Sequence, residues 1–406
     1  MRSLLVLGCT GSIGVQTLDV VRASGGRFRV TGLAARASWR ELAKQALEFQ
    51  PRYVALEDPS AAEDLRALLP ASIELLAGPD ALERLCERAD FELAVHGVVG
   101  ARGVRASERV LARGKLLALA NKESLVVAGA ELMELARVRG GAILPVDSEL
   151  CAIHQCLAGA PMKSVRRIVL TASGGPFRDF EPERLEGATP AMALKHPTWS
   201  MGPRITIGSA TLMNKALEVV EAHHLFGLER ARIEVVIHRQ SIVHSLVEFV
   251  DGSVLAQMGP PDMRGPLHYC LHHPGRAPST LRGFDVELFR QLSFEPVDPR
   301  RFPALELGFE CVEQGGDSGA VLNAADEVTV QAFLEGQIAF PQITSINRDV
   351  LARRPRLEGS IERLLEADQR SRELARLAIA QAALARADLG PAAIEQASAA
   401  AARPQR

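Results

Sequence analysis

The chain is 406 residues long, 47% of them hydrophobic and 24% charged, with a formal net charge of −2. This length indicates two or three domains and is ample for a large apolar core. The balanced charge disfavours a nucleic-acid partner, and no apolar run reaches the ~20 residues of a membrane span. The six cysteines are scattered, and the short apolar start leads into a glycine turn rather than a cleavage site. We therefore expect a cytoplasmic protein with reduced thiols that binds neither nucleic acid nor membrane.

Short apolar runs alternate with helical patterns over the first 147 residues. The first run leads into a glycine turn and a helical pattern, and a second helix is expected at 39–49. This alternation predicts a parallel, doubly wound sheet, which is a Rossmann-like α/β arrangement. The expected strands are 3–7, 28–34, 53–56, 93–96, 116–120 and 142–146.

After residue 163 the pattern becomes that of a mixed α+β region. A helix is expected over 211–223, and the Asp251-Gly252 pair predicts a hairpin turn. Five prolines and little periodicity indicate a linker at 274–303, and the chain is helical in pattern from 304 onward. The expected later strands are 167–172, 233–237, 241–250 and 253–258. The expected organisation is a Rossmann-like domain at 1–147, a central α+β domain at 148–273, a linker at 274–303, a C-terminal helical domain at 304–392 and a tail at 393–406.

The glycine turn after the first strand is a candidate dinucleotide site. Gly8, Gly11 and Gly14 stand between a strand and a helix, where backbone N–H groups and the positive helix end can face a phosphate. A plain tight turn is the alternative. The second strand is followed by Arg36 rather than by the acid that an NAD ribose would need, which favours NADP. The alternative for Arg36 is a solvated loop charge.

Acidic residues form a second candidate site. Asp147 and Glu149 follow a buried strand and, in an extended chain, would point the same way. A surface loop or a helix N-terminus is the alternative. Ser209 fits an N-cap, and Glu218 lies one helical turn from Asn214 and Lys215, although a solvated face with a Lys–Glu pair would give the same pattern. Carboxylate and amide oxygens suit Mg²⁺ or Mn²⁺ rather than zinc.

Two further segments are candidates for ligand contact. The Ser173-Gly174-Gly175 turn after a strand can cradle an anion. The polar loop 195–202 holds His196 and Trp199, which fit either a lid or, for the tryptophan, a core anchor. His268 and His272 have a spacing that zinc can use on a helix, but the glutamate of that motif is absent, so we interpret them as ordinary structure.

Several longer motifs then match a known family. The chain resembles 1-deoxy-D-xylulose 5-phosphate reductoisomerase from Gly8 to about Leu377. The motifs are Gly-x-Thr-Gly-Ser-Ile-Gly at 8–14, Ala-Asn-Lys-Glu-Ser at 120–124, Pro-Val-Asp-Ser-Glu at 145–149, Ser-Gly-Gly-Pro-Phe at 173–177, His-Pro-Thr-Trp-Ser-Met-Gly at 196–202, Ser-Ala-Thr-Leu-Met-Asn-Lys at 209–215, Asp-Gly-Ser-Val-Leu-Ala-Gln at 251–257 and Leu-Asn-Ala-Ala at 322–325.

The resemblance implies a homodimeric enzyme of the non-mevalonate isoprenoid pathway. The family converts 1-deoxy-D-xylulose 5-phosphate to 2-C-methyl-D-erythritol 4-phosphate with NADPH and Mg²⁺, Mn²⁺ or Co²⁺. The resemblance also implies that 148–273 is the catalytic and dimerisation domain. By motif, Asp147, Glu149 and Glu218 correspond to metal ligands. The implied substrate residues are Ser148, Glu149, Ser173, His196, Trp199, Ser209, Asn214, Lys215 and Glu218. The implied cofactor residues are Thr10, Gly11, Ser12, Ile13, Asn121, Lys122, Glu123 and Gly202. Arg36 is added to them because it stands after the second strand, where an NAD-binding protein would have an acid.

The chain also departs from the family pattern. Arg36-Ala37-Ser38 stands where the family has Gly-Lys/Arg-Asn, which bears on cofactor preference. Gly208 replaces the usual Asp before Ser209, Ala216 replaces a Gly, and Asp326-Glu327 replaces Asn-Glu.

The expected chemistry is a metal-assisted rearrangement of an α-hydroxy ketone followed by hydride transfer. Two other functions stay open from the residues. One is an NADP-dependent sugar or semialdehyde dehydrogenase without rearrangement, and the other is a non-catalytic nucleotide-binding regulator.

Overall fold

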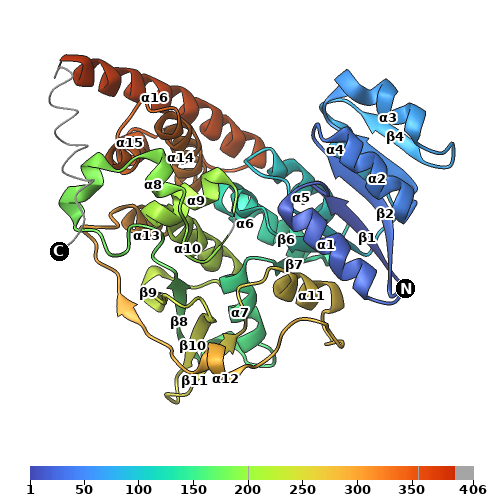
Figure 1. Ribbon diagram of the computed structural model, residues 1–406, viewed down its shortest axis with the longest axis horizontal. Helices are drawn as coiled ribbons and strands as arrows, with labels where there is room; N and C mark the ends of the chain where they lie inside the picture. Colours follow the sequence, from blue (N-terminus) through green and yellow to red (C-terminus); the bar gives the residue numbers. More distant parts are fainter. Residues whose placement is uncertain (200, 355, 389–406) are drawn as a thin grey trace. The chain divides into compact units, whose positions relative to one another are not determined.

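The computed structural model describes residues 1–199, 201–354 and 356–388. The chain divides into two compact units, coloured along the sequence in Figure 1. The first unit comprises Met1–Leu125, Gly129–Gln155 and Asp262–Asp285. The second comprises Val126–Ala128, Cys156–Pro261 and the chain from Val286 onward. The tail expected at 393–406 lies outside the described residues.

A parallel sheet of seven strands forms the centre of the first unit. Its order is β4-β3-β2-β1-β5-β6-β7, and every neighbouring pair is parallel. The chain therefore runs outward from β1 to β4 and then returns to the other side of β1, which confirms the doubly wound arrangement. The strands are β1 (Arg2–Leu7), β2 (Phe28–Ala35), β3 (Tyr53–Leu56), β4 (Glu74–Ala77), β5 (Leu93–His96), β6 (Leu116–Leu119) and β7 (Ala142–Pro145).

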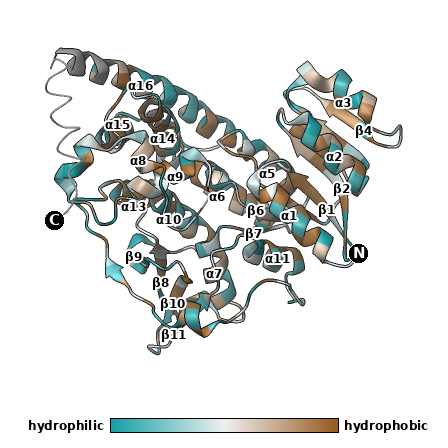
Figure 2. Cartoon of the chain, in the orientation of Figure 1, coloured by the Kyte–Doolittle hydropathy of each residue, from teal (hydrophilic) through white to brown (hydrophobic). Residues whose placement is uncertain are grey.

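These strands form because they are apolar on both faces. Leu4 to Leu7 of β1 are buried without alternation, as expected for a parallel strand that helices cover on both sides. Figure 2 shows the hydrophobic colour along β1 and β2. Among these strands only β4 was not expected, because only Leu76 in it is fully buried. The helices of this unit are α1 (Ser12–Ala23), α2 (Trp39–Phe49), α3 (Ala62–Leu68), α4 (Ala81–Arg88), α5 (Gly103–Ala112), α6 (Lys122–Arg139), α7 (Ser148–Cys156) and α11 (Arg264–His272).

Helix α11 joins the first unit from far along the chain. Its buried residues Leu267, Cys270 and Leu271 belong to the same apolar cluster as Leu144 and Val146. The thiol of Cys270 also donates to the carbonyl oxygen of Pro145 at 3.3 Å. The six cysteines are all free, in agreement with the sequence expectation.

The second unit contains a five-stranded mixed sheet with the order β11-β10-β8-β9-β12. Strand β8 is parallel to β9, and the other pairs are antiparallel. The stretch expected as a linker contains α12 (Val286–Phe289) and the short β12 (Glu295–Pro296), which pairs with β9. The other strands are β8 (Val165–Ala172), β9 (Ile233–Ile237), β10 (Val243–Phe249) and β11 (Val254–Met258).

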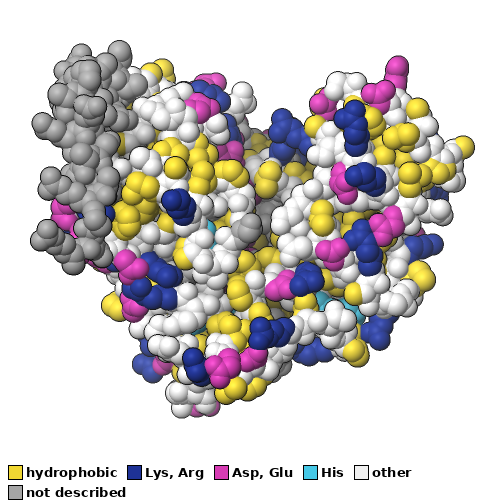
Figure 3. Space-filling view, in the orientation of Figure 1, with side chains coloured by type: hydrophobic (Ala, Val, Ile, Leu, Met, Phe, Trp, Pro, Cys, Tyr) yellow, Lys and Arg dark blue, Asp and Glu magenta, His cyan; other side chains and the backbone are white. Residues whose placement is uncertain are grey.

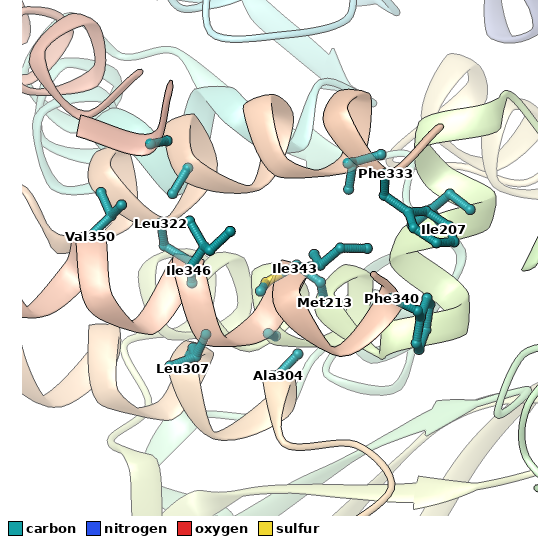
Figure 4. Packing of buried hydrophobic residues seen from close by; sticks show 14 of the residues in the cluster. Ile207, Met213, Ala304, Leu307, Leu322, Phe333, Phe340, Ile343, Ile346 and Val350 are labelled. Atoms are coloured by element: carbon teal, nitrogen blue, oxygen red, sulfur yellow. The ribbon is translucent and has the colours of Figure 1, made fainter. Parts of the chain in front are cut away.

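The helices of the second unit share one apolar core. Figure 4 shows Ile343 and Ile346 pointing toward Leu322 and Met213, so the C-terminal helices and the central helices pack in the same cluster. Helical structure is therefore confirmed for the described part of the region that starts at 304, which ends at Asp388. The helices are α8 (Pro190–Ala193), α9 (Pro203–Thr211), α10 (Met213–Phe226), α13 (Ala304–Gln314), α14 (Ser318–Leu334), α15 (Phe340–Ala352) and α16 (Ile361–Asp388).

The surface mixes both signs of charge. Figure 3 shows basic and acidic side chains interleaved on the face in view, in keeping with the near-zero net charge. Across the described residues, no helix combines the length and the apolar character that a bilayer crossing needs.

Candidate functional site

The glycine turn between β1 and α1 is shaped for a close approach of backbone. Gly8 has φ +80°, and a Cβ on Gly14 would lie 2.3 Å from the carbonyl oxygen of Gly8. Helix α1 has Gly11 as its N-cap, no side chain caps it, and no acid stands in its first turn. Its positive end is therefore left for an external anion. A plain turn does not need the tight contact at Gly14, whereas a dinucleotide fingerprint does.

The sheet order places this turn where an open α/β sheet binds ligands. Strand β1 has β2 on one side and β5 on the other, so the chain reverses direction there. The N–H of Gly97, just after β5, donates to Leu7 at 2.9 Å, and a Cβ on Gly8 would lie 2.9 Å from Gly97. Thr10, Gly11, Ser12 and Ile13 thus lie at the carboxyl ends of β1 and β5, at the topological switch point.

Arg36 follows β2 directly, and its side chain is exposed. An acid does stand nearby, but at the end of β3 rather than β2. This acid is Glu57, which is paired with Arg102 at 2.9 Å. Burial raises the pKa of Glu57, while Arg102 and Arg36 act against that rise. Two arginines, Arg36 and Arg102, therefore act on Glu57 at the carboxyl ends of β2 and β3. Their positive charge fits an anionic group near Arg36.

Asn121 is buried at the start of α6 and acts as its N-cap. Its Oδ1 accepts the N–H of Ser124 at 2.9 Å, and its Nδ2 donates to Val98 at 2.7 Å and Gly100 at 3.1 Å. The same amide donates to Glu123 at 2.8 Å. Asn121 and Glu123 therefore hold the loop after β5 against α6, and both are more than nine-tenths buried.

Asp147 caps helix α7, which corrects the expectation of an extended pair. Its Oδ1 accepts the N–H of Glu149 at 3.1 Å and of Leu150 at 3.3 Å. Because α7 begins at Ser148, Asp147 and Glu149 lie on the first helical turn and not on one side of a strand. The hydroxyl of Ser148 donates to Glu149 at 2.5 Å. The helix-N-terminus alternative was the right one for this segment.

Lys122 forms an ion pair with Asp147, and sequence analysis missed this contact. Both side chains are largely buried. The two residues follow β6 and β7, which are adjacent and parallel, with Leu119 beside Pro145. That register could have been inferred from the alternating pattern, since parallel neighbours end at one edge of the sheet.

In the second unit, His196 bridges two serines. Its Nε2 lies 3.1 Å from Ser173 Oγ and 3.0 Å from Ser209 Oγ. Its Nδ1 accepts the backbone N–H groups of Thr198 and Trp199 at 3.1 and 2.8 Å. Because Nδ1 accepts, the ring proton is on Nε2 and is directed at the serines. Burial, reinforced by the charge of Arg178, lowers the pKa of His196 to about 4, so the ring is neutral at pH 7.

A break between α9 and α10 determines where Ser209 and the polar residues of α10 lie. It also corrects the expectation that Ser209 is an N-cap. Ser209 lies inside α9, which starts at Pro203, and the break falls at Leu212, whose φ of 59° is left-handed. Proline at the first helical position starts α9 earlier than the sequence pattern indicated. Gly175 fits against the end of α9, since a Cβ there would lie 2.5 Å from the Ser209 carbonyl oxygen.

Helix α10 buries a polar cluster on its first two turns. Glu218 Oε1 accepts from Asn214 Nδ2 at 2.6 Å, and Lys215 forms an ion pair with Glu218. Lys215 is 3% exposed and Glu218 is 1% exposed, so the pair is no solvated face. Burial of charged groups is costly and marks a site with a specific role.

Trp199 and Gly202 frame the segment before α9. Trp199 is only partly buried, which disfavours the core-anchor alternative. Gly202 is the exposed N-cap of α9. His268 and His272 hydrogen-bond to backbone carbonyls, of Pro278 at 3.3 Å and of His268 at 2.9 Å, in line with a structural role. Sequence analysis also missed Arg178 and Arg204, which carry no short motif of their own.

A doubly wound sheet with a glycine cradle at its switch point, joined to a second unit with buried carboxylate, lysine and serine–histidine groups, defines a Rossmann-type oxidoreductase. Comparison with known proteins gives the family. Models of 1-deoxy-D-xylulose 5-phosphate reductoisomerase match residues 4–129, and models of its C-terminal domains match 143–226 and 258–374. The chain belongs to the 1-deoxy-D-xylulose 5-phosphate reductoisomerase family.

Individual relatives agree with this assignment. The reductoisomerase of Anaeromyxobacter dehalogenans is 48% identical over 351 residues, covering 86% of this chain and 90% of the relative. That of Pelotomaculum thermopropionicum is 47% identical over 377 residues, covering 92% and 97%. The Zymomonas mobilis enzyme, solved with NADPH, has a TM-score of 0.88 at 40% identity, covering 93% of this chain and 99% of that one. A reductoisomerase solved with NADPH, fosmidomycin and magnesium has a TM-score of 0.87 at 36% identity, covering 93% and 98%.

Proposed function

We propose that this enzyme converts 1-deoxy-D-xylulose 5-phosphate to 2-C-methyl-D-erythritol 4-phosphate, with NADPH and a divalent cation, in non-mevalonate isoprenoid biosynthesis. One observation carries the proposal beyond the family match. The hard-oxygen residues that a chelated α-hydroxy ketone reaction needs are all present, two on the first turn of α7 and one buried on α10. A dehydrogenase without rearrangement or a non-catalytic regulator has no need of this set.

Asp147, Glu149 and Glu218 would hold Mn²⁺, Mg²⁺ or Co²⁺. The donor set fits a hard cation, because all three are carboxylates and no thiol or imidazole belongs to it. When bound, the cation polarises the substrate carbonyl as a Lewis acid. Lys122 and Lys215 each neutralise one of these carboxylates in the structure, which offsets the cost of keeping anionic groups in a largely buried place.

The first unit would bind NADPH. The Gly14 cradle fits a pyrophosphate, since any Cβ there would fill the space that the turn needs. When bound, the nicotinamide supplies the hydride. Thr10, Gly11, Ser12 and Ile13 would contact the pyrophosphate, and Arg36 would contact the 2′-phosphate. Asn121, Lys122, Glu123 and Gly202 complete the proposed cofactor residues.

The second unit would bind the substrate. Ser173, Ser209, Asn214 and Lys215 would hold the phosphate, and Ser148 would contact the carbon backbone. Neutral His196 would orient both serine hydroxyls through its Nε2 proton. The segment with His196 and Trp199 would close over the substrate and exclude water from the reactive aldehyde.

A single assay tests this function. NADPH oxidation is followed with 1-deoxy-D-xylulose 5-phosphate, with Mn²⁺ and after treatment with EDTA, and the product is identified. We expect metal-dependent turnover to the branched polyol phosphate. Metal-independent reduction without rearrangement would indicate a simple dehydrogenase, and NADPH binding without turnover would indicate a regulator.

We further propose that the enzyme is a cytoplasmic homodimer that pairs through β11. This strand is at the edge of its sheet, and Val254 and Leu255 are 53% and 49% exposed. An apolar, unpaired edge is a template for another strand, and a second copy presents the same edge. Leu255→Lys should therefore give monomers in light scattering, while the matched change Leu377→Lys, at an exposed leucine on α16, should not. A dimeric Leu255→Lys protein would contradict this surface.

A further inference from the structure

A largely buried network of charges fixes the start of α9. Arg204 Nη1 donates to Glu327 Oε1 at 3.0 Å, and its Nη2 donates to Asn323 Oδ1 at 2.8 Å. Both partners are on α14. From the other side, Arg372 of α16 donates to Glu327 Oε2 at 2.8 Å and is itself held by Asp368 at 2.7 Å. Asn323 Nδ2 also donates to Glu327 at 3.2 Å.

The charges of this network balance, and Glu327 is its centre. Burial acts to raise the pKa of Glu327, but Arg204 and Arg372 outweigh it, so the pKa is lowered and the residue is ionised. Burial raises the pKa of Asp368, with Arg372 opposing. Two arginines therefore share two carboxylates, and the guanidinium fork of Arg204 uses two separate nitrogens on two acceptors.

Helix α9 has only nine residues. Its first turn contacts α14, and its last turn contacts His196. Arg204 is on its first turn. Ile207, one turn later, lies in the apolar cluster near Phe333 and Phe340, as Figure 4 shows. Ser209 on the last turn reaches His196. A short helix held at one end by a forked ion pair transmits that position to the other end, because its backbone is rigid over this length.

We propose that Arg204 is a positioning residue for substrate binding: by clamping α9 to Asn323 and Glu327 of α14, it sets where Ser209 and the segment 196–199 stand. This inference rests on the proposed function, which gives Ser209, His196 and Trp199 their substrate. On this proposal Arg204 acts through its bonds to Asn323 and Glu327 and not by contact with substrate or cofactor. The main effect of changing it is accordingly on the sugar phosphate, because among the proposed cofactor residues only Gly202, the N-cap of α9, belongs to this helix.

The test compares Arg204→Lys and Arg204→Met with the wild type. Lysine keeps the charge but cannot reach two acceptors as a fork, and methionine keeps only the bulk. We expect the KM for 1-deoxy-D-xylulose 5-phosphate and the Kd for fosmidomycin to rise roughly tenfold in Arg204→Lys and further in Arg204→Met, on the scale of one charge-assisted hydrogen bond. The Kd for NADPH should stay within about twofold.

Two control variants separate positioning from general damage. Arg167→Lys makes the same change in an exposed pair with Glu234 and Glu248, and it should leave all constants unchanged. Asp368→Asn loosens the same network on the α16 side without touching Arg204, so it should lower Tm without raising the KM. Equal losses for substrate and NADPH, or an equal rise in KM for Asp368→Asn, would mean that the network is only structural.

The remaining outcomes are also decisive. If Arg204→Met does not fold, Arg204→Lys carries the test alone. A normal KM and normal fosmidomycin affinity in a folded Arg204→Lys protein would overturn the positioning role. If the wild type itself fails to turn over the substrate, the proposed function is wrong. If Trp199→Ala raises the KM while Arg204→Lys does not, the lid stands and this inference falls.

Discussion

At the scale of single residues, Asp147 combines a capping role with a proposed ligand role, and one substitution separates them. Asparagine caps a helix about as well as aspartate, so Asp147→Asn keeps α7 but removes the negative charge. We expect turnover to fall at least about a hundredfold, the scale of several kcal/mol lost from a metal ligand. The apparent Kd for Mn²⁺ should rise, and circular dichroism should stay unchanged.

Asp251→Asn is the matched control for that prediction. Asp251 also accepts a backbone N–H, that of Ser253 at 2.9 Å, but it is exposed and does not belong to the proposed site residues. It should retain wild-type activity and metal affinity. Near-normal turnover of Asp147→Asn in Mn²⁺ would remove Asp147 from the ligand set.

Arg36 is the residue on which cofactor preference is predicted to depend. An arginine–phosphate contact is charge-assisted, about 1.5–3 kcal/mol net, or about ten- to a hundredfold in affinity. Arg36→Ala should raise the KM for NADPH and leave that for NADH nearly unchanged. Arg29→Ala, at an exposed position on β2, the strand that Arg36 follows, is the control. Equal losses with both cofactors would mean that Arg36 holds the loop instead of contacting the 2′-phosphate.

At the scale of helices, we predict opposite changes in stability when two helical glycines are replaced by alanine. A Cβ on Gly208 of α9 would lie 3.4 Å from Asn214 N, which is ordinary contact, whereas a Cβ on Gly308 of α13 would lie 2.3 Å from Ala216 O. Gly208→Ala should therefore stabilise the protein by about 0.5–1 kcal/mol through helix propensity and chain entropy. Gly308→Ala should destabilise it by about 1–3 kcal/mol through overpacking.

Chemical denaturation of both variants measures these changes. Each variant serves as the control for the other. Both replace a helical glycine by alanine, and only the room for the added Cβ differs. A loss of stability in Gly208→Ala would show that α9 cannot take a side chain at the position where the family usually carries an aspartate.

The same elements show how far the sequence could be interpreted. The helix at 39–49 and the strand at 233–237 were predicted to the residue, because their apolar period is unbroken. The break at Leu212 was not predictable, because a leucine with positive φ has no local signal and is held there by tertiary contacts. Likewise Asp147 caps α7 through hydrogen bonds that an i, i+2 spacing does not distinguish from a strand.

At the scale of the whole molecule, histidines make stability depend on pH. The pKa values of several histidines are lowered, chiefly by burial, and those of His96, His196 and His224 fall to about 4. The unfolded chain therefore takes up protons from about pH 6.5 downward while the folded chain does not. Stability should be full above pH 6.5 and should fall progressively toward pH 4.

Urea titrations at pH 7.5, 6.5, 5.5 and 5.0 test this dependence. Fully buried His96 alone accounts for about 2 kcal/mol at most over this range. His96→Gln should flatten the slope between pH 6.5 and 5 because it removes a fully buried histidine whose pKa is lowered to about 4. A free energy of unfolding that stays constant from pH 7.5 to 5 would contradict the prediction.

The division into two units could not be obtained from the sequence, although the Rossmann-like class could be predicted and candidate site residues could be proposed. Motifs can be recognised in short stretches of sequence, and so can the alternation of strands and helices that predicts a parallel sheet. The shared core joins Met213 of α10 to Leu307, Leu322 and Ile346, which lie roughly 90–130 residues later in the chain, and no local pattern specifies such pairings.

Helix α11 has a consequence for synthesis on the ribosome. The last strand of the first sheet ends at Pro145, but Leu267 and Leu271, which complete its apolar core, are translated about 120 residues later, or roughly 6–25 s at cellular elongation rates. The nascent chain must therefore carry an uncovered apolar patch through that interval. Vectorial folding, in which each region closes before the next emerges, is thereby ruled out for the first unit, and its final closure follows emergence of most of the central region.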